Sequence, residues 1–211
     1  MKQEVIELSH PILSHKLGQL RDIKTDSSKF RALMDQISTF LAYKAFDYLE
    51  VETVTVDTPQ GSSQESIVLE QNHLLVSILR AGNGMINGFL EVLPMAKVGH
   101  IGLYREPSTY VPIEYYFKMP KNISNMDSFV LDPMLATGHS AVAAISRLKE
   151  VCQAKISYIC VLASPEGLDY FQEHHPDVKI ITAKIDKCLD DNKYIVPGLG
   201  DAGDLAFGSK L

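Results

Sequence analysis

Hydrophobic residues near the start of the chain recur with the period of an α-helix. Apolar side chains stand three and four positions apart through residues 11–22 and again through residues 29–49, where they include Phe30, Leu33 and Ile37. This spacing places them on one face of a helix. We therefore predict two N-terminal helices, whose apolar faces pack against the rest of the chain or against another copy of it.

Beyond residue 50 the pattern changes to short apolar runs that are rich in β-branched residues. The runs VETVTV (51–56) and SIVLE (66–70) flank a turn at 59–61 and predict two strands. Residues 104–120 carry three prolines and several aromatic side chains between β-like runs. That segment is expected to form a hairpin-like excursion from the main fold.

Strand and helix patterns alternate through most of the remaining sequence. The runs are, in order, LLVSIL (74–79), MINGFLEVL (85–93), VGHIGLY (98–104), SFVLD (128–132), SAVAAISRLKEVC (140–152), ISYICVLA (156–163), PEGLDYFQEHH (165–175) and VKIITAKI (178–185). Such alternation favours a parallel sheet covered by helices. The predicted fold is therefore α/β, a mostly parallel twisted sheet with flanking helices, a β-hairpin excursion and N-terminal helices. Without a repeat or linker, residues 1–211 are expected to form a single domain.

Composition and charge narrow the classes of function. Of the 211 residues, 45% are hydrophobic and 22% are charged, as in a globular protein with a sizeable core. The formal net charge of −6 argues against general affinity for nucleic acid or an anionic membrane. No apolar run approaches the roughly 18 residues of a membrane span. Three scattered cysteines without a CxxC spacing favour buried thiols in a reducing compartment, so we expect a cytoplasmic protein.

Two glycine-rich stretches fail as dinucleotide-binding fingerprints. GLGDAG (198–203) matches GxGxxG, but only eight residues follow it, which leaves no room for the helix and strand that the fingerprint requires. RAGNGMING (80–88) lies between a predicted strand and helix, yet its third glycine comes one residue late. Neither stretch ends in the GK[ST] of a P-loop.

Three loops nevertheless follow predicted strands, at residues 80–84, 132–140 and 197–203. Ligands of open parallel sheets bind beyond the carboxyl ends of the strands, so these loops are expected to meet at one site. The first loop brings the guanidinium of Arg80. The site is therefore a candidate for an anionic ligand.

The second loop has the features of a phosphate and sugar site. Gly138 permits close approach of the backbone, while Thr137, Ser140 and the N–H groups at the start of the next helix can donate hydrogen bonds to a phosphate. The carboxylate of Asp132 can only accept, which suits sugar hydroxyls. We predict a phosphorylated sugar as ligand, with an ordinary capped strand-to-helix turn as the alternative.

VLDPMLATGHSA (130–141) resembles the phosphoribosyl diphosphate (PRPP) motif of type I phosphoribosyltransferases. The segments ILRAGNGM, VGHIGLYRE, IEYYFKMP and YIVPGLGDAGD follow the order and approximate spacing of uracil phosphoribosyltransferases. The resemblance implies the type I phosphoribosyltransferase fold. It also implies transfer of the 5-phosphoribosyl group from PRPP to N1 of uracil, giving UMP and diphosphate. Mg²⁺ would be the cofactor, held through PRPP and water rather than directly by the protein.

Residues carry over from the family one by one. The resemblance assigns PRPP binding to Arg80, Arg105, Asp132, Pro133, Met134, Leu135, Ala136, Thr137, Gly138, His139, Ser140 and Asp201. It assigns uracil binding to Ile195, Gly200, Asp201 and Ala202. Arg105, Asp132 and Asp201 are the expected catalytic residues, with Arg105 on an excursion that could close over the site.

Two positions depart from the family pattern. His139 stands where the family usually has a second glycine, and Leu205 stands where it usually has arginine. If the backbone at residue 139 needs a positive φ, a histidine there costs on the order of 1 kcal/mol. Two other histidines, His174 and His175, end a polar helix and are expected to face solvent.

These departures leave alternatives to the active enzyme. One is a catalytically weak protein that binds PRPP or a nucleotide and regulates pyrimidine metabolism, since a fold does not fix a function. Another is a transferase for a different base, which the uracil loop disfavours. The family resemblance and the apolar helix at 30–49 predict a homodimer or larger homo-oligomer. GTP is a candidate effector, because activation by GTP varies within the family.

Overall fold

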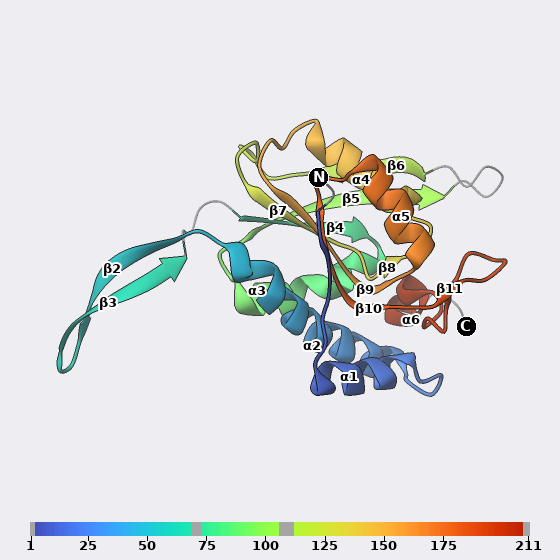
Figure 1. Ribbon diagram of the computed structural model, residues 1–211, viewed down its shortest axis with the longest axis horizontal. Helices are drawn as coiled ribbons and strands as arrows, with labels where there is room; N and C mark the ends of the chain where they lie inside the picture. The colour runs from blue at the N-terminus through green and yellow to red at the C-terminus, as the bar shows by residue number, and fades with distance from the viewer. Residues whose placement is uncertain (1–2, 69–72, 106–111, 209–211) are drawn as a thin grey trace.

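A mostly parallel sheet forms the centre of the protein (Figure 1). The computed structural model describes residues 3–68, 73–105 and 112–208, except for the side chain of Arg105. The strands lie in the order β1 (Val5–Glu7), β10 (Lys179–Ile185), β9 (Ile156–Ala163), β7 (Asp127–Leu131), β4 (His73–Leu79), β5 (Lys97–Arg105) and β6 (Pro112–Lys118), and β8 (Met134–Leu135) also pairs with β9. All of these pairings are parallel except that of β5 with β6. The predicted α/β fold is confirmed.

Helices cover both faces of this sheet. Helices α1 (Pro11–Arg21), α2 (Ser27–Ala45) and α3 (Ile86–Val92) pack on one face, and α4 (His139–Lys149) and α5 (Pro165–His174) pack on the other. The strands supply both cores by alternation: Tyr158 and Cys160 of β9 face α4 and α5, whereas Ile159 and Val161 face α1 and α2. The central strands are therefore apolar on both sides.

The helix boundaries follow from local capping. Asp26 accepts a hydrogen bond from the backbone N–H of Lys29 at 2.8 Å and begins α2, and Ser164 caps α5 ahead of a proline at its first position. Helix α2 ends at Ala45, where a 3₁₀ turn, η1 (Phe46–Tyr48), replaces the last residues of the predicted helix. The apolar face of α2 is buried in the core of its own chain, so packing within the chain is confirmed.

Two hairpins extend from this body. Strands β2 (Val51–Thr58) and β3 (Gly61–Val68) form a separate antiparallel sheet that projects away from the rest of the protein (Figure 1). Strands β5 and β6 form the predicted excursion, whose tip at 106–111 lies outside the described residues. Every residue of β2 and β3 is exposed or half-buried.

His175 is buried, so the expectation that it faces solvent is wrong, while His174 is exposed. The Nε2 of His175 lies 3.1 Å from the carbonyl of Val142 and 3.1 Å from Oγ of Ser146, and its Nδ1 lies 3.2 Å from Nζ of Lys149. An ammonium can only donate, so Nδ1 accepts and Nε2–H donates, which is the neutral imidazole. Burial lowers the pKa of His175, and the nearby charge of Lys149 lowers it further.

This burial predicts a specific sensitivity to acid. As the pH falls through about 6.5, the unfolded chain protonates this imidazole more readily than the folded protein does, because folding lowers its pKa, so the free energy of unfolding decreases. Lys149, Asp177 and His174 also face the ring, and solvent screens them in part. We therefore expect His175→Gln to remove a few tenths of a kcal/mol to about 1 kcal/mol of the stability loss between about pH 7.5 and about pH 5.5. Urea unfolding at both pH values measures this; equal losses in both proteins would mean that His175 is protonated in the folded state.

Candidate active site

A cavity of about 430 Å³ lies at the carboxyl ends of the parallel strands. It brings together the three loops that the sequence places there. The lining residues are Ile78, Leu79, Arg80, Ala81, Leu103, Asp132, Met134, Leu135, Ala136, Gly138, Ser140, Ala141, Asn192, Lys193, Tyr194, Gly200, Asp201, Ala202 and Gly203. Pro133, Thr137, His139 and Ile195 belong to the same loops but do not line this cavity.

The first loop leaves β4 at Leu79 and continues as the 3₁₀ turn η2 (Ala81–Met85). The guanidinium of Arg80 is 54% exposed and forms an ion pair with Asp204 at 3.1 Å. A Cβ on Gly82 would lie 2.2 Å from the carbonyl oxygen of Leu131, the last residue of β7. Glycine at this position therefore allows the first loop to pass directly beside the start of the second.

The second loop turns at Gly138, which has a φ of 83° and precedes α4. A Cβ there would lie 3.0 Å from the carbonyl of Gly167 and 3.0 Å from the ring of Tyr170. His139 is the first helical residue, and the described non-glycine residues with positive φ are Asn122 and Lys193. The backbone cost considered for His139 therefore does not arise.

The imidazole of His139 points toward α5 rather than lining the cavity. Its ring stacks on Tyr170, with 4.4 Å between centroids, and Tyr170 stacks in turn on His174 at 4.3 Å. The side chain of His139 is exposed. At this position the loop can therefore approach a ligand with its backbone while the side chain packs elsewhere.

Asp132 is half-buried at the end of β7 and is held by a neighbouring strand. The phenol of Tyr158, fully buried in β9, donates a hydrogen bond to Oδ2 of Asp132 at 3.2 Å. Sequence reasoning missed Tyr158; a lone tyrosine inside the apolar run ISYICVLA was the available signal, because a buried phenol needs a partner. Nearby, burial raises the pKa of the Cys160 thiol to about 12, so that group is neutral and unsuited to nucleophilic chemistry.

The third loop runs from the short strand β12 (Ile195–Val196), which pairs with β11 (Cys188–Leu189), into helix α6 (Ala202–Phe207). Gly198 and Gly200 have φ values of 56° and 87°, so the backbone turns sharply twice. Asp201 caps α6 by accepting a hydrogen bond from the N–H of Asp204 at 2.9 Å. Leu205 packs against the hydrophobic core.

The structure also adds residues that the sequence did not indicate. Asn192, Lys193 and Tyr194 form part of the cavity wall. They belong to a turn in which Asp190 accepts hydrogen bonds from the N–H groups of Lys193 and Tyr194. The composition of this segment indicates a turn, but not which face of the molecule the turn covers. The side chain of Arg105 lies outside the described part of the chain.

Other features of the described residues bear on what the protein can bind. No group of three or more histidine, cysteine or acidic side chains in these residues could hold a metal ion. Within the same ranges, no helix has the length and apolar character needed to cross a membrane. A second cavity, of about 600 Å³, lies where the parallel strands begin and contains none of the predicted site residues.

Comparisons with known proteins agree along the whole chain. A family model described as uracil phosphoribosyltransferase matches residues 7–209. A uracil phosphoribosyltransferase of Legionella pneumophila is 48% identical over 208 residues, covering 99% of this chain and 97% of that protein. One from Myxococcus xanthus is 48% identical over 203 residues, covering 96% of each.

Solved structures give the same result for the fold. The AQ2163 protein from Aquifex aeolicus has a TM-score of 0.92 at 34% identity, covering 99% of this chain and all of that one. A hypoxanthine-guanine phosphoribosyltransferase from Bacillus anthracis has a TM-score of 0.51 at 10% identity, covering 76% and 80% of the two chains, and that likeness concerns the fold alone. The expected type I phosphoribosyltransferase fold is confirmed. Since the family match extends over nearly every residue and the relatives align from end to end, this chain belongs to the uracil phosphoribosyltransferase family.

Proposed function

We propose that this protein transfers the 5-phosphoribosyl group of PRPP to N1 of uracil, forming UMP and diphosphate. The observation that carries the proposal is the single cavity shared by the loop from Asp132 to Ser140 and the loop from Gly200 to Gly203. The first loop offers groups suited to a sugar phosphate. The second offers backbone suited to a planar base.

The 5-phosphate would bind where the second loop enters α4. The first backbone N–H groups of a helix have no partners within the helix, and the helix dipole favours an anion there. Gly138 and Ser140 line the cavity at this point, and α4 is 11 residues long. The hydroxyl of Ser140, which lines the cavity, would add a donor.

Asp132 would accept hydrogen bonds from the ribose hydroxyls. Its hydrogen bond from Tyr158 leaves the carboxylate oriented before substrate arrives. A carboxylate held in place by a rigid neighbour loses less freedom on binding than a mobile one. Asp132 is accordingly proposed to orient the ribose rather than to act as a general base.

Uracil would be recognised by the backbone of the third loop. Along O2, N3–H and O4 the base presents an acceptor, a donor and an acceptor, which fixed N–H and C=O groups of Gly200 and Ala202 can complement. Cytosine has no N3 proton and carries an amino group at position 4. Binding it would leave buried polar groups unpaired, which disfavours it strongly.

Charge development explains the proposed roles of the arginines. As the bond from ribose C1 to the diphosphate oxygen breaks, positive charge grows on the sugar and negative charge on the leaving group. Arg80 lies at the cavity, where its guanidinium would stabilise the departing diphosphate. Arg105 is proposed for the same role. The N1 atom of uracil then bonds to C1, and its proton passes to the released diphosphate or to water.

The residues present fit a magnesium ion carried by the substrate. Mg²⁺ usually keeps several waters and binds substrate phosphates together with one or two carboxylates. Asp132 and Asp201 both line the cavity, and either carboxylate could accept hydrogen bonds from metal-bound water. When bound, the ion supplies positive charge to the diphosphate.

We infer that the two departures from the family pattern are compatible with an active enzyme. His139 has an ordinary helical backbone and stacks on Tyr170. Leu205 packs on the core. We propose a cytoplasmic location, which suits three free cysteines, two of them buried. Activation of the protein by GTP stays a hypothesis.

We propose a homodimer or larger assembly, but with a contact surface other than the helix predicted from the sequence. The apolar face of α2 is covered within the chain. The β2–β3 hairpin instead presents exposed Val51, Val56 and Ile67, which are 57%, 39% and 40% exposed. An isolated two-stranded hairpin is marginally stable in water, so this one would gain by packing against a second copy.

The first prediction concerns the reaction. Purified protein with PRPP, Mg²⁺ and labelled uracil should form UMP, whereas cytosine and hypoxanthine should give no detectable nucleotide. Repeating the assay with GTP tests the effector. Asp132→Asn should raise the KM for PRPP by roughly tenfold or more, because the ribose loses an ionic acceptor. Absence of UMP while PRPP still binds in calorimetry would contradict the proposal and favour the regulatory alternative.

The second prediction concerns the phosphate loop. Gly138→Ala places a Cβ 3.0 Å from the Gly167 carbonyl at a φ of 83°, so PRPP affinity should fall by roughly tenfold or more. Gly208→Ala is the matched control, because that glycine also has a positive φ of 70° but open space around it. The control should lose stability on the order of 1 kcal/mol and keep PRPP affinity. Equal PRPP affinity in both variants would remove this loop from the binding site.

The third prediction concerns assembly. Light scattering should give a dimer or larger species for the full chain. Replacing residues 52–67 by a short glycine linker should shift the protein toward monomer, since Val51 and Val68 already lie opposite each other in the hairpin. Shortening only the tip at 57–62 is the control for changes in folding. A monomeric full chain, or a deletion variant that assembles normally, would contradict the proposal.

A further inference from the structure

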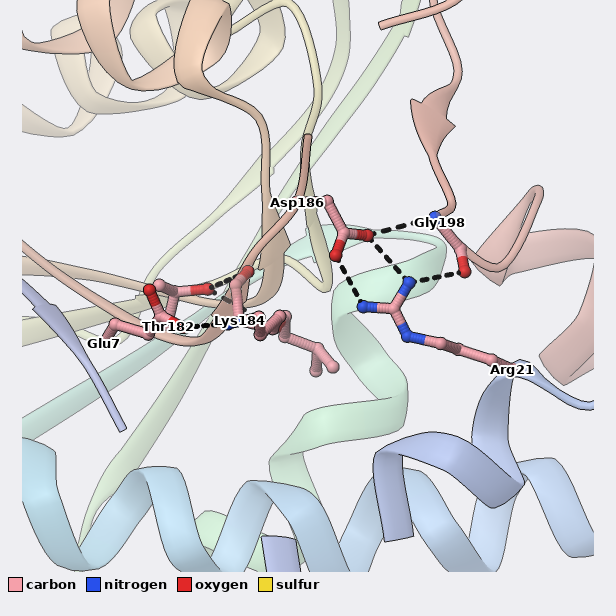
Figure 2. Close-up of polar contacts among 7 residues, drawn as sticks. Glu7, Arg21, Thr182, Lys184, Asp186 and Gly198 are labelled. Atoms are coloured by element: carbon pink, nitrogen blue, oxygen red, sulfur yellow. Dashed lines mark hydrogen bonds and ion pairs between the residues drawn. The ribbon is translucent and has the colours of Figure 1, made fainter. Parts of the chain in front are cut away.

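An ion pair joins the first helix to the C-terminal loop of the site (Figure 2). The guanidinium of Arg21, the last residue of α1, donates to both carboxylate oxygens of Asp186, at 2.8 and 2.7 Å. Arg21 also donates to the carbonyl of Gly198 at 2.9 Å. The N–H of Gly198 donates to Asp186 at 3.0 Å. Both backbone polar groups of Gly198 are thus bound by one ion pair.

The pair is well shielded from water. The side chain of Asp186 is 3% exposed and that of Arg21 is 19% exposed. A bidentate arginine–carboxylate contact has a fixed geometry, and removing one partner of a buried pair leaves the other charge uncompensated. Unlike an exposed ion pair, this contact therefore fixes the relative positions of the segments that it joins.

Gly198 is the point at which the loop changes direction. Its φ is 56°, and a Cβ there would lie 2.0 Å from the carbonyl of Ile195. The segment that lines the cavity, Gly200 to Gly203, begins two residues later. Any shift of Gly198 would therefore move the backbone groups proposed to read uracil.

A second contact holds the other end of the same segment. Arg31 of α2 donates to the carbonyl of Ala206 at 2.8 Å, near the end of α6. Residues 198–206 are thus fastened at both ends to the N-terminal helices. The phosphate loop is supported differently, because Oγ of Ser164 at the start of α5 donates to the carbonyl of Ala136 at 2.6 Å.

We propose that Arg21 and Asp186 are positioning residues for uracil, which hold the third loop in its binding geometry without contacting the base. This inference rests on the proposed function, since it names the substrate whose binding the loop controls. It separates the two substrates: loss of the ion pair weakens uracil binding most. PRPP binding is expected to change less, because the third loop reaches PRPP only through Asp201 and the Arg80–Asp204 ion pair, while β7, α4 and α5 support the rest.

Steady-state kinetics, in which the concentrations of uracil and PRPP are varied in turn, test whether the two KM values respond differently. Arg21→Met should raise the KM for uracil by roughly tenfold and the KM for PRPP by less than about twofold. Arg21→Lys keeps the charge and a single contact and should give an intermediate KM for uracil. Asp186→Asn should resemble Arg21→Met, and the double variant should be no worse than the more severe single one, because the two residues act as a unit.

Lys184→Met is the matched control. Lys184 lies two residues before Asp186 and forms an ion pair with Glu7 at 2.6 Å, with side chains 50% and 34% exposed (Figure 2). This variant also removes a cation from an ion pair, but one that does not contact the loop. It should leave both KM values unchanged.

Hydrogen exchange of the substrate-free protein tests the inference without requiring catalytic activity. Arg21→Met and Arg21→Lys should speed exchange of the amides at 199–206 and leave those at 137–142 as in the wild type. Faster exchange without a selective rise in the KM for uracil, or unchanged exchange in both variants, would overturn the inference. If the wild type makes no UMP, the proposed function fails, whereas exchange still decides whether the ion pair holds the loop.

Discussion

The candidate active site depends on the parallel pairing of β4, β7, β9 and β10. The pairings bring the carboxyl ends of the strands together: Leu131, the last residue of β7, lies opposite Ser77 of β4 and Ile159 of β9. Ala163 and Ile185, the last residues of β9 and β10, lie opposite each other. Because parallel strands run in the same direction, the segments that leave them emerge at one edge of the sheet. Loops far apart in sequence thereby become the walls of one cavity.

Close contacts between backbones turn this shared edge into a defined site. Gly82 allows the first loop to lie against the last residue of β7, and a Cβ on Gly167 of α5 would lie 2.2 Å from the carbonyl of Ala136. Ser164 binds that same carbonyl and also caps α5. The loop that we assign to phosphate is therefore fixed from both sides by backbone geometry, and this explains how a histidine can follow Gly138 without distorting it.

The sequence predicted the parts of the molecule that follow local or periodic rules. These include the alternating strands and helices, the excursion and the three loops beyond the strand ends. It did not predict contacts between side chains distant in sequence. Arg21 lies 165 positions from Asp186 and 177 from Gly198, and neither residue type nor spacing indicates such a pair. The same reason explains the missed partner of Asp132 and the buried His175, whose environment comes from another helix.

The contact between Arg21 and Asp186 also bears on how the protein is made. Synthesis proceeds from the N-terminus, so α1 emerges from the ribosome well before the segment that completes its ion pair, which lies 165 positions further on. The cavity is therefore incomplete on a nascent chain. Removal of α1 or of the segment that carries Asp186 and Gly198 would disturb the same wall of the cavity, although the two segments are far apart in the sequence.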